Sequence, residues 1–548
     1  MKTFNDLKRY FKNDILFEND IDNFNSDIQI DLFFSNTKDF EYLSDYFNKL
    51  NLSLNKGLVF SYCSYNNPLV LYKTEILKLN PIAIIIDRDI YFSILYKDKD
   101  YLDKLITELT LNNIKLIVVK DLNIVDFLKF FYSLDLSNLN IYGVTGTNGK
   151  TTITTILYHL CRDLSNYNDL FLSSLIGTIK YCVDDQVVSK SDVSNSLLTT
   201  PDTSLIYYLL FLSNINKVKN VFMEVSSHSL DQDRPKGLDF KISSFTNLGI
   251  DHLDYHKTID NYFEAKKKLF FNYRNDFVVI NRFYNEYGNI LYNQLTNMRS
   301  MDDIFSYFIK YYEFRLDGMD FVLNFYKGNE LIEINFCKDI GFSTNLIGVF
   351  NIHNLAIVFL NFYIMCNFVY GVDYMDFFRD YIKGINFLEG RLELVSKSPL
   401  VFVDYAHTPD ALENVIKSII EYRDRLNLGD IYVVFGAGGN RDKTKRPIMG
   451  NIVSNLADKV IITSDNPRDE DPLSIINDIL SGVVKKDKVV VEVSRESAII
   501  KALNNMKLND ILLIAGKGHE NYQIIGNKRV FFSDKEVVKK FLSKIRAI

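Results

Sequence analysis

The chain of 548 residues has no tryptophan, only five cysteines and no long tract of basic residues. No two cysteines form a C-x-x-C pair, and their odd number in a large chain fits a reducing compartment with buried thiols. The 63 basic and 69 acidic residues give a formal net charge of −6, which makes nucleic acid a poor candidate partner. Tyrosine and phenylalanine are abundant, but we attribute this to a compositional bias and infer no function from it.

The sequence also lacks an apolar run long enough to cross a membrane. The most apolar stretch, Leu355 to Tyr370, is shorter than the roughly 20 residues that a span needs, and Asn361 and Asn367 interrupt it. We therefore predict a buried helix there. The first residues, MKTFNDLKRYFKND, have no apolar core of a signal peptide. We expect a cytoplasmic monomer that binds neither membrane nor nucleic acid.

The length exceeds that of a single hydrophobic core and suggests roughly three domains. Hydrophobic residues make up 47% and charged residues 24%, as in soluble globular proteins. We place the domains at residues 1–138, 139–375 and 376–548. In the first, strand-like runs such as Ala83 to Ile86 and Ile114 to Val119 alternate with polar helical segments, which predicts a small α/β domain.

The last domain contains four short apolar runs separated by helical segments, which is typical of a doubly wound parallel sheet. Each run is followed by a polar motif: DYAHTPD, GAGGNRD, SDNPRDEDP or AGKGHE. Because ligands bind beyond the carboxyl ends of strands in such sheets, we expect a binding site there. The predicted strands are Leu400 to Val403, Ile431 to Phe435, Val460 to Thr463 and Ile511 to Ile514, with Asn220 to Glu224 and Phe277 to Ile280 in the central domain.

A glycine-rich turn, GVTGTNGKTT, lies between an apolar strand-like stretch and a helical run, as in a nucleotide-binding P-loop. Gly146 and Gly149 would let the backbone approach phosphate oxygens, and the N–H groups and helix dipole would face the anion. Lys150 would reach the β- and γ-phosphates, and Thr151 would bind Mg²⁺. Val144 stands where the standard pattern has glycine, so this is a variant P-loop. The alternative is a glycine-rich turn with a chance lysine.

Three residues downstream of the P-loop have the types that metal and phosphate chemistry uses. Glu224 ends a strand-like run and takes the place of a Walker-B carboxylate that holds Mg²⁺. His252 follows another strand-like segment, and Lys266 lies on a predicted helix. Six of the seven histidines lie in compact polar motifs, and only His159 falls on a plain helix. For Lys266 and the two lysines after it, the alternative is a solvated helix face.

Nine short motifs occur in a fixed order along the central and C-terminal parts of the chain. They are TGTNGKT, EVSSH, NLGIDHLDYH, FNIHN, GRLE, DYAHTPD, GNRDKTKRP, DNPR and GKGHE, between residues 145 and 520. In these motifs the chain resembles the Mur ligases, an ATP-dependent family that builds the peptidoglycan stem peptide. It most resembles the branch that adds the third residue to a UDP-N-acetylmuramoyl-dipeptide. The resemblance implies a small N-terminal α/β domain, a central P-loop ATPase-like domain and a C-terminal Rossmann-like domain.

The resemblance also implies the catalytic residues Lys150, Glu224, His252 and Lys266. Lys266 falls where the family carries a lysine carbamylated by CO₂, and the carbamate would share one Mg²⁺ with His252. The other Mg²⁺ would lie between the ATP phosphates, Thr151 and Glu224. ATP would be bound by Thr145, Gly146, Thr147, Asn148, Gly149, Lys150, Thr151, Thr152, Asn354 (at the adenine), Arg391, Asp404 and Tyr405. The UDP-muramoyl substrate would be bound by Thr199, Thr200, Ser226, Gln232 and Arg234.

The DNPR motif indicates the third amino acid. Arg468 can pair bidentately with a carboxylate at the far end of a side chain, which meso-diaminopimelate has and L-lysine and L-ornithine lack. The sequence therefore favours diaminopimelate over those two. By the resemblance, the pocket is completed by Arg441, Asp465, Asn466, Gly516 and Glu520, with Glu520 facing the distal ammonium. The alternative for Asp465-Asn466-Pro467 is a plain β-turn.

The expected reaction follows from charge. Attack of the substrate carboxylate on the γ-phosphate brings two anions together, so Lys150 and two Mg²⁺ ions would neutralise their approach. The amine of the incoming amino acid would attack the resulting acyl phosphate, and phosphate would leave. Closure of the C-terminal domain over the nucleotide would exclude water and orient the amine.

The chain departs from the family pattern in several places. The first domain has no D-S-R motif at the uridine site; the nearest stretch is Phe34 to Lys38, and KGLVF at Lys56 to Phe60 resembles the next element. Residues common in the family are also replaced at Leu198, Glu389, Ala437 and Asn440.

We weigh three other functions. EVSSH, DYAHTPD and DNPR speak against a folylpolyglutamate synthase, and a P-loop kinase would not account for the C-terminal motifs. The presence of Lys150, Glu224, His252 and Lys266 argues against a non-catalytic nucleotide-binding scaffold of cell-wall synthesis.

Overall fold

The structure, a computed structural model, divides into two compact units. The first unit comprises Met1–Gly143, Cys161–Lys241 and Phe271–Arg274; the second comprises Val144–Leu160, Ile242–Phe270 and Asn275–Ile548. The structure describes residues 99–119, 123–190, 198–334, 337–385, 390–526 and 528–546, with shorter segments at 2–3, 6, 9–10, 15–18, 29–30, 32–34, 58–62 and 83–87. Glu389, most of Phe34 to Lys38 and the start of KGLVF lie outside the described residues.

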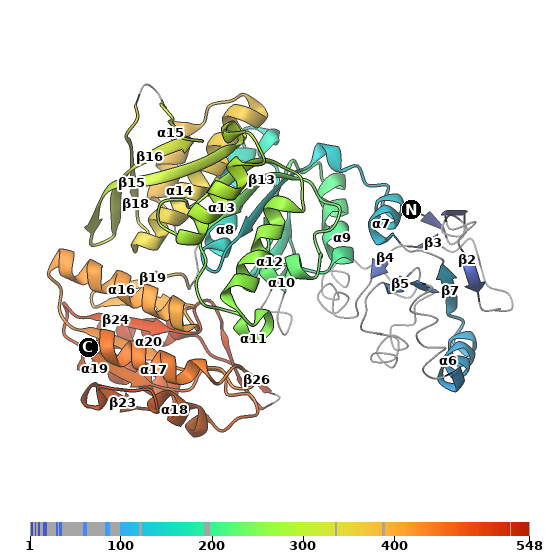
Figure 1. The fold of residues 1–548 in the computed structure, drawn as a ribbon. Helices are drawn as coiled ribbons and strands as arrows, with labels where there is room; N and C mark the ends of the chain where they lie inside the picture. Colours follow the sequence, from blue (N-terminus) through green and yellow to red (C-terminus); the bar gives the residue numbers. More distant parts are fainter. Residues whose placement is uncertain are drawn as a thin grey trace. The chain divides into compact units, whose positions relative to one another are not determined.

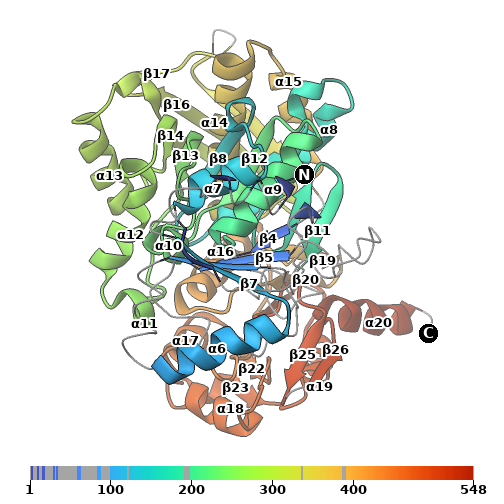
Figure 2. The same ribbon diagram turned by 90° about the vertical axis from the view of Figure 1, so that its right-hand side faces the viewer.

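The N-terminal part of the first unit is a five-stranded sheet (Figure 1). Its elements are β2 Ile15–Glu18, β4 Leu32–Phe34, β5 Leu58–Tyr62, β6 Ala83–Asp87, α6 Lys99–Leu111 and β7 Lys115–Val119, and β1 Lys2–Thr3 pairs separately with β3 Gln29–Ile30. The strand order is β2-β7-β6-β5-β4, with only β2 antiparallel to its neighbour. Helix α6 packs against β7 (Figure 2). Both strands predicted in this part are confirmed as β6 and β7.

The rest of the first unit contains a second set of strands and helices. They are α7 Ile124–Phe131, β9 Ser173–Ile176, β10 Lys180–Val183, β11 Gln186–Lys190, α9 Thr203–Ile215, β12 Asn220–Glu224 and α10 Ser227–Asp231. The strand order is β11-β10-β9-β12, and β9 runs parallel to β12. The predicted strand that ends at Glu224 is thus confirmed as β12. Along the chain, β8 Asn140–Thr145 and β13 Phe240–Phe245 begin in this unit and end in the second.

The second unit begins with the P-loop helix and a long antiparallel hairpin. Its first elements are α8 Lys150–Ser165, α11 Leu253–His256, α12 Ile259–Phe271, β14 Asn275–Ile280, α13 Glu286–Thr296, β15 Ile304–Arg315, β16 Gly318–Lys327, β17 Glu330–Leu331, β18 Ile340–Thr344, α14 Val349–Ile364, the π-helix η4 Met365–Tyr370 and α15 Met375–Lys383. β14 confirms the predicted strand at Phe277 to Ile280 and runs parallel to β15. β15 and β16 form the hairpin, and β16 also pairs with β17 and β18. Short 3₁₀ helices are η3 Met301–Asp303 and η5 Lys486–Lys488 in this unit, and η1 Leu136–Asn138 and η2 Asp169–Phe171 in the first.

Helix α14 and its continuation η4 form the one helix, among the described residues, that is long and apolar enough to cross a membrane. In its most apolar window 78% of the residues are buried inside the protein. The helix packs on β14, β15 and β16, and Phe359 stacks on Phe325 with 4.4 Å between ring centroids. The amide of Asn361 donates to the Ser244 hydroxyl at 2.9 Å, which satisfies a polar group in this core. The predicted buried helix is therefore confirmed. It starts at Val349, before the expected Leu355, and is for that reason longer than the sequence analysis allowed.

The second unit ends in a doubly wound sheet. Its elements are β19 Glu393–Lys397, β20 Leu400–Asp404, α16 Pro409–Leu426, β21 Ile431–Phe435, α17 Lys445–Leu456, β22 Lys459–Ile462, α18 Pro472–Leu480, β23 Val489–Val491, α19 Arg495–Asn505, β24 Ile511–Ala515, β25 Tyr522–Ile525, β26 Lys528–Phe531 and α20 Asp534–Arg546. The strand order is β19-β20-β24-β21-β22-β23, parallel except at β19. All four predicted strands are confirmed, whereas the edge strands β19 and β23 and the hairpin β25–β26 were not predicted.

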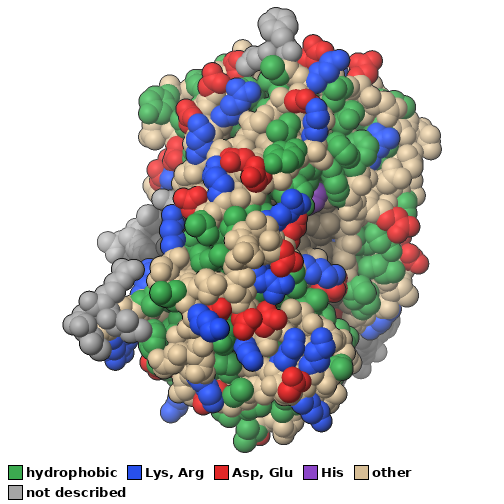
Figure 3. Space-filling model, turned by 90° about the vertical axis from the view of Figure 1, so that its left-hand side faces the viewer, with side chains coloured by type: hydrophobic (Ala, Val, Ile, Leu, Met, Phe, Trp, Pro, Cys, Tyr) green, Lys and Arg blue, Asp and Glu red, His purple; other side chains and the backbone are tan. Residues whose placement is uncertain are grey.

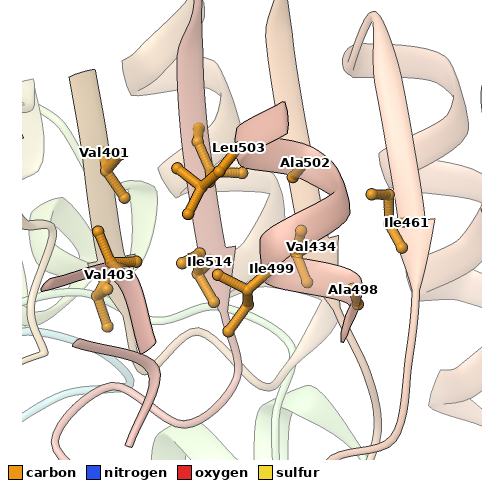
Figure 4. Close-up of a cluster of buried hydrophobic side chains, with 11 residues drawn as sticks. Val401, Val403, Val434, Ile461, Ala498, Ile499, Ala502, Leu503 and Ile514 are labelled. Carbon is orange, nitrogen blue, oxygen red and sulfur yellow. The ribbon is translucent and has the colours of Figure 1, made fainter. Parts of the chain in front are cut away.

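Both faces of this sheet are covered by helices. On one face Val403 and Ile514 pack with Ile499 of α19 in a buried cluster (Figure 4). On the other face Phe402 lies edge-on to Tyr422 of α16, with 5.9 Å between ring centroids. Because alternate residues of a strand point to opposite faces, continuous apolar strands are what a sheet covered on both sides requires. The polar motifs follow the strands at their carboxyl ends.

Candidate active site

The glycine-rich turn links β8 directly to α8, as predicted. Gly146 and Gly149 have φ angles of +146° and +90°. A Cβ at Gly146 would lie 1.8 Å from Oγ1 of Thr246, and one at Gly149 would lie 2.4 Å from Oδ1 of Asn354. Both positions therefore require glycine, because no side chain fits and the backbone is in the left-handed region.

The segment after β13 holds the loop in shape. The N–H of Thr147 donates to the carbonyl of Asn247 at 2.9 Å, and the N–H of Asn148 donates to Oδ1 of Asn247 at 3.0 Å. The Thr147 hydroxyl lies 3.2 Å from that of Tyr262. Nζ of Lys150 donates to two carbonyl oxygens of the loop at 2.7 and 2.9 Å. Lys150 thus already lies over the turn. Thr145 and Thr152 are buried, and Thr151 is half-buried at the start of α8.

Lys266 lies in α12 with only 1% of its surface exposed. Its Nζ donates to the carbonyl of Gly146 at 2.9 Å and lies 4.3 Å from the ring centroid of Tyr262. Burial lowers the pKa of Lys266 well below its usual value, the charge of Lys150 lowers it further, and Asp251 opposes the shift. A buried neutral amine can react with CO₂, whereas an ammonium cannot. The alternative of a solvated helix face is therefore wrong for Lys266.

His252 has a left-handed backbone, with φ of 54°, and its side chain is 46% exposed. Its Nε2 lies 3.4 Å from Oδ2 of Asp251, a carboxylate that the sequence analysis did not single out although it precedes His252 directly. Within the described part of the chain, no three His, Cys, Asp or Glu side chains are grouped so that they could hold a metal ion.

Glu224 ends β12 in the first unit and is 1% exposed. Its Oε1 accepts the N–H of Thr178 at 2.8 Å, and its Oε2 accepts the Thr178 hydroxyl at 3.0 Å. A Cβ at Gly177 would lie 2.5 Å from Oε1, so the carboxylate lies directly against this glycine. Thr178 Oγ1 also lies 3.1 Å from Oγ1 of Thr199. The sequence analysis missed Gly177 and Thr178, whose only signal is a Gly-Thr pair just after β9.

The other residues predicted for the UDP-muramoyl substrate lie close together in the first unit. The Thr200 hydroxyl accepts the N–H of Ser226 at 2.9 Å. Arg234 donates to the carbonyl of Thr200 at 2.7 Å and to Oε1 of Gln232 at 2.7 Å. Arg234 also pairs with Asp202 at 3.1 Å. The predicted set is thus one hydrogen-bonded cluster beyond the carboxyl end of β12.

Asn354 lies on α14 and is buried beside the glycine-rich turn. Its Nδ2 donates to Oδ1 of Asn351 at 3.2 Å. The neighbouring His353 contacts the Tyr307 hydroxyl through Nδ1 at 3.0 Å, and burial lowers the pKa of His353 to about 4. His353 is therefore neutral near pH 7 and lies half-buried against Tyr307.

Three of the six histidines assigned to polar motifs lie on helices. They are His228 on α10, His256 on α11 and His353 on α14. His159 was the only histidine expected on a plain helix, and the structure shows that these three motif histidines lie on helices as well. Short polar helices such as α10 and α11 carry too few apolar residues to show a helical period in the sequence.

Asp404, Arg391 and Tyr405 lie together at the carboxyl end of β20. The two carboxylate oxygens of Asp404 accept the N–H groups of Leu392 at 2.6 Å and Ala406 at 2.7 Å. Burial raises the pKa of Asp404, and Arg391 and the two N–H groups oppose that shift. The Arg391 guanidinium lies 4.8 Å from the ring centroid of Tyr405. Through these hydrogen bonds Asp404 connects the motif GRLE to the motif DYAHTPD.

The motifs DNPR and GKGHE meet beyond the carboxyl ends of β22 and β24. Nδ2 of Asn466 donates to Oε2 of Glu520 at 2.9 Å. A Cβ at Gly516, whose φ is 114°, would lie 2.8 Å from Oδ2 of Asp465. Asp465 and Asn466 are only 7% and 4% exposed. The segment is therefore more than a surface β-turn. Lys517, which contacts this cluster, is a further residue that the sequence analysis missed.

Arg468 follows this segment and is half-buried, with a left-handed φ of 53°. Its Nη1 donates to the carbonyl of Gly439 at 2.7 Å. A Cβ at Gly438 would lie 3.0 Å from Nη1 of Arg468 and 3.7 Å from Cγ of Arg441. The two arginines therefore flank one glycine. Arg441 is exposed, and a guanidinium has more N–H donors than the one that Arg468 uses here.

These features define a nucleotide-binding α/β protein with a variant P-loop and a separate site on a doubly wound sheet. The chain belongs to the Mur ligase family. The Mur ligase middle domain matches residues 144–361, and the Mur ligase glutamate ligase domain matches residues 390–518.

Three known proteins illustrate the likeness. The UDP-N-acetylmuramoyl-L-alanyl-D-glutamate–2,6-diaminopimelate ligase of Aquifex aeolicus is 38% identical over 417 residues, 75% of this chain and 79% of the relative. A solved structure of a ligase of that name is 26% identical, with a TM-score of 0.54 over 89% of this chain and 93% of the other. The MurF ligase of Thermotoga maritima, solved with ADP, is 16% identical, with a TM-score of 0.53 over 94% and 97%, and shares the fold. The predicted fold class is confirmed.

Proposed function

We propose that this protein is an ATP-dependent ligase that joins meso-diaminopimelate to the D-glutamate of UDP-N-acetylmuramoyl-L-Ala-D-Glu, in the cytoplasm, for peptidoglycan synthesis. The observation that carries the proposal is the cluster of Arg468, Asn466 and Glu520 beyond one parallel sheet. A guanidinium and a carboxylate match the distal carboxylate and ammonium of diaminopimelate. The name of the relative that is 38% identical supports the same substrates.

ATP would bind at the P-loop. The backbone of Gly146 to Gly149 offers N–H groups to the phosphates, and Lys150 lies over the same turn. Asn354, buried against Gly149, would read the adenine, and Arg391, Asp404 and Tyr405 would contact the nucleotide from the C-terminal motifs. Thr145, Thr147, Asn148, Thr151 and Thr152 complete the predicted set.

The residues present fit two Mg²⁺ ions and a carbamate. Thr151 and Glu224 each offer oxygen ligands, and His252 with a carbamylated Lys266 would offer a nitrogen and oxygens. The burial of Lys266 and its lowered pKa support carbamylation, because both favour the uncharged amine, which is the form that attacks CO₂. When bound, Mg²⁺ supplies positive charge that offsets the repulsion between the substrate carboxylate and the γ-phosphate.

The protein's own groups would then act in sequence. Lys150 and the N–H groups of the turn stabilise the negative charge that grows on the transferred phosphoryl group while the D-glutamate carboxylate attacks it. Arg468 and Glu520 hold the far end of diaminopimelate, so that its other amine can attack the acyl phosphate and expel phosphate. Exclusion of water by the C-terminal domain protects the acyl phosphate from hydrolysis.

The remaining assignments complete the proposal. The UDP-muramoyl substrate would bind at the cluster of Thr199, Thr200, Ser226, Gln232 and Arg234. The domains would span residues 1–138, 139–375 and 376–548, in a monomer. Acidic and basic side chains are intermingled on the face shown in Figure 3, which supports a small-molecule site over a nucleic-acid surface.

The decisive experiment is phosphate release by the purified protein with ATP, Mg²⁺ and UDP-N-acetylmuramoyl-L-Ala-D-Glu. Meso-diaminopimelate, L-lysine and L-ornithine are compared in parallel. We expect release that depends on diaminopimelate. Release with lysine or ornithine instead would keep the ligase and overturn the role of Arg468. No release with any of the three would overturn the proposed function and favour a non-catalytic scaffold.

A further inference from the structure

The turn after β24 carries one long side chain that points inward. Gly516 and Gly518 both have positive φ, 114° and 52°. A Cβ at Gly516 would lie 2.8 Å from Oδ2 of Asp465, and one at Gly518 would lie 2.7 Å from Cβ of Tyr405. Between these glycines stands Lys517, whose side chain is 0% exposed. A fully buried lysine is rare and requires specific partners.

Lys517 has two oxygen partners, and both belong to the proposed amino-acid pocket. Its Nζ donates to Oδ1 of Asn466 at 3.1 Å and to Oε2 of Glu520 at 2.9 Å. Oδ1 of Asn466 also accepts the N–H of Ile524 at 3.0 Å. Two donors at this atom fix which end of the amide is oxygen, so the NH₂ end must donate. It does so to Oε2 of Glu520.

The two carboxylate oxygens of Glu520 therefore differ in their hydrogen bonding. Oε2 of Glu520 accepts two hydrogen bonds, one from Lys517 and one from Asn466. Oε1 has no hydrogen-bond partner in the part of the chain that the structure describes. One oxygen of Glu520 therefore fixes the side chain, and the other can accept a hydrogen bond from a ligand.

The charge of Lys517 also acts on the rest of the pocket. Burial by itself raises the pKa of Asp465, but the charges of Lys517 and Arg495 outweigh it, so the pKa of Asp465 is lowered. The positive charge of Lys517 therefore acts on two neighbouring acidic side chains, Asp465 and Glu520.

We propose that Lys517 is a positioning residue for the third substrate: it fixes Asn466 and Glu520 so that Oε1 of Glu520 accepts the distal ammonium of a diamino acid. The inference rests on the proposed function and adds a residue to it. Lys517 acts through Glu520 and does not contact the substrate itself. Its role is therefore specificity for the distal amino group.

The first test compares the steady-state kinetics of Lys517→Met and Lys517→Arg with wild type. Methionine removes the donors, and we expect the KM for diaminopimelate to rise about 10- to 100-fold, the loss typical of hydrogen bonds to charged groups. The KM for ATP and for the UDP-muramoyl substrate should stay unchanged. Arginine keeps a buried positive donor and should restore part of the loss. The control is Arg423→Met, which removes the pair with Asp458 (3.1 Å) at the amino ends of the strands.

The second test uses 2-aminopimelate, which lacks the distal amino group. Wild type should prefer diaminopimelate in kcat/KM, as should Arg423→Met, and Lys517→Met should lose most of that preference. Glu520→Gln should lose it too, and the double variant should be no worse than either single one. If Lys517→Met is insoluble, Lys517→Gln, with a single amide donor group, takes its place.

The outcomes separate the two proposals. Wild type without diaminopimelate-dependent turnover would overturn the proposed function, and this inference with it. An active wild type together with a Lys517→Met variant of unchanged KM and unchanged preference would overturn the inference alone. A lower melting temperature and lower kcat at unchanged KM would mean a purely structural role and would also overturn it.

Discussion

At the scale of single residues, burial decides the chemistry of otherwise ordinary side chains. Lys266 and Lys267 are adjacent on α12, yet only Lys266 is enclosed, against Gly146 and Tyr262. Lys267 pairs with Glu264 at 2.7 Å instead. The pKa of Lys266 is lowered by desolvation, which favours the uncharged, nucleophilic form of its amine. Two neighbours of one residue type therefore have different surroundings.

Lys266→Ala should abolish ligation, because it removes the group that would carry the carbamate. We expect kcat to fall by at least about 100-fold, the usual cost of losing one transition-state-stabilising group. A short carboxylate such as acetate or propionate should restore part of the activity by supplying an oxygen ligand. The matched control is Lys267→Ala, which should retain activity. Full activity of Lys266→Ala would contradict the carbamate.

At the scale of secondary-structure elements, strand ends and tight turns bring the functional groups together. The turn between β8 and α8 is shaped by glycines with no room for a Cβ, and Asn247 of the segment after β13 binds it. The carboxyl ends of β20, β22 and β24 carry the motifs of the C-terminal site. Since parallel strands end at one edge of a sheet, motifs far apart in sequence meet there.

Gly146→Ala should weaken nucleotide binding without unfolding the protein. The new methyl group would meet Oγ1 of Thr246 at a positive φ, and we expect the Kd for ADP to rise at least about 10-fold through strain in the turn. Calorimetric titration with ADP measures the change. Gly341→Ala is the control, since a Cβ there meets nothing within 4 Å. Equal ADP affinity of the two variants would contradict the role of the turn.

At the scale of the whole molecule, two half-buried histidines with lowered pKa values make stability depend on pH. Burial lowers the pKa of His353 to about 4, and burial together with Arg391 lowers that of His519 to about 3. In the unfolded chain a histidine titrates near about 6.5. The unfolded state therefore binds more protons below that pH. The stabilisation is present in full above pH 6.5 or so and is lost as the pH falls towards the folded pKa values.

His353→Gln should reduce this pH dependence. In wild type, His353 alone should lower the free energy of unfolding by about 2 kcal/mol between about pH 7.5 and about pH 5. Glutamine can still hydrogen-bond Tyr307 but does not titrate. Urea unfolding at the two pH values measures the difference, with the half-exposed His252→Gln as the control. The same pH dependence in His353→Gln as in wild type would contradict the assignment.

The sequence alone determined the order of motifs, the glycine turn and most buried strands of the parallel sheets. These follow from local rules, because strand periodicity and glycine's freedom at positive φ act within a few residues. Short or exposed edge strands such as β19 and β23 were not predicted from the sequence, because a few residues at the edge of a sheet show no continuous apolar run. The binding roles of the predicted residues stay predictions.

Only the tertiary structure decided which polar residues are enclosed. The burial of Lys266, the contact of His353 with Tyr307 and the contact of Lys517 with Asn466 all depend on segments distant in sequence. Desolvation and hydrogen bonding are properties of surroundings, and no local pattern of residue types specifies them. The sequence therefore specifies which chemical groups the protein has. The packing of its elements determines the burial, the hydrogen bonds and the pKa values of those groups.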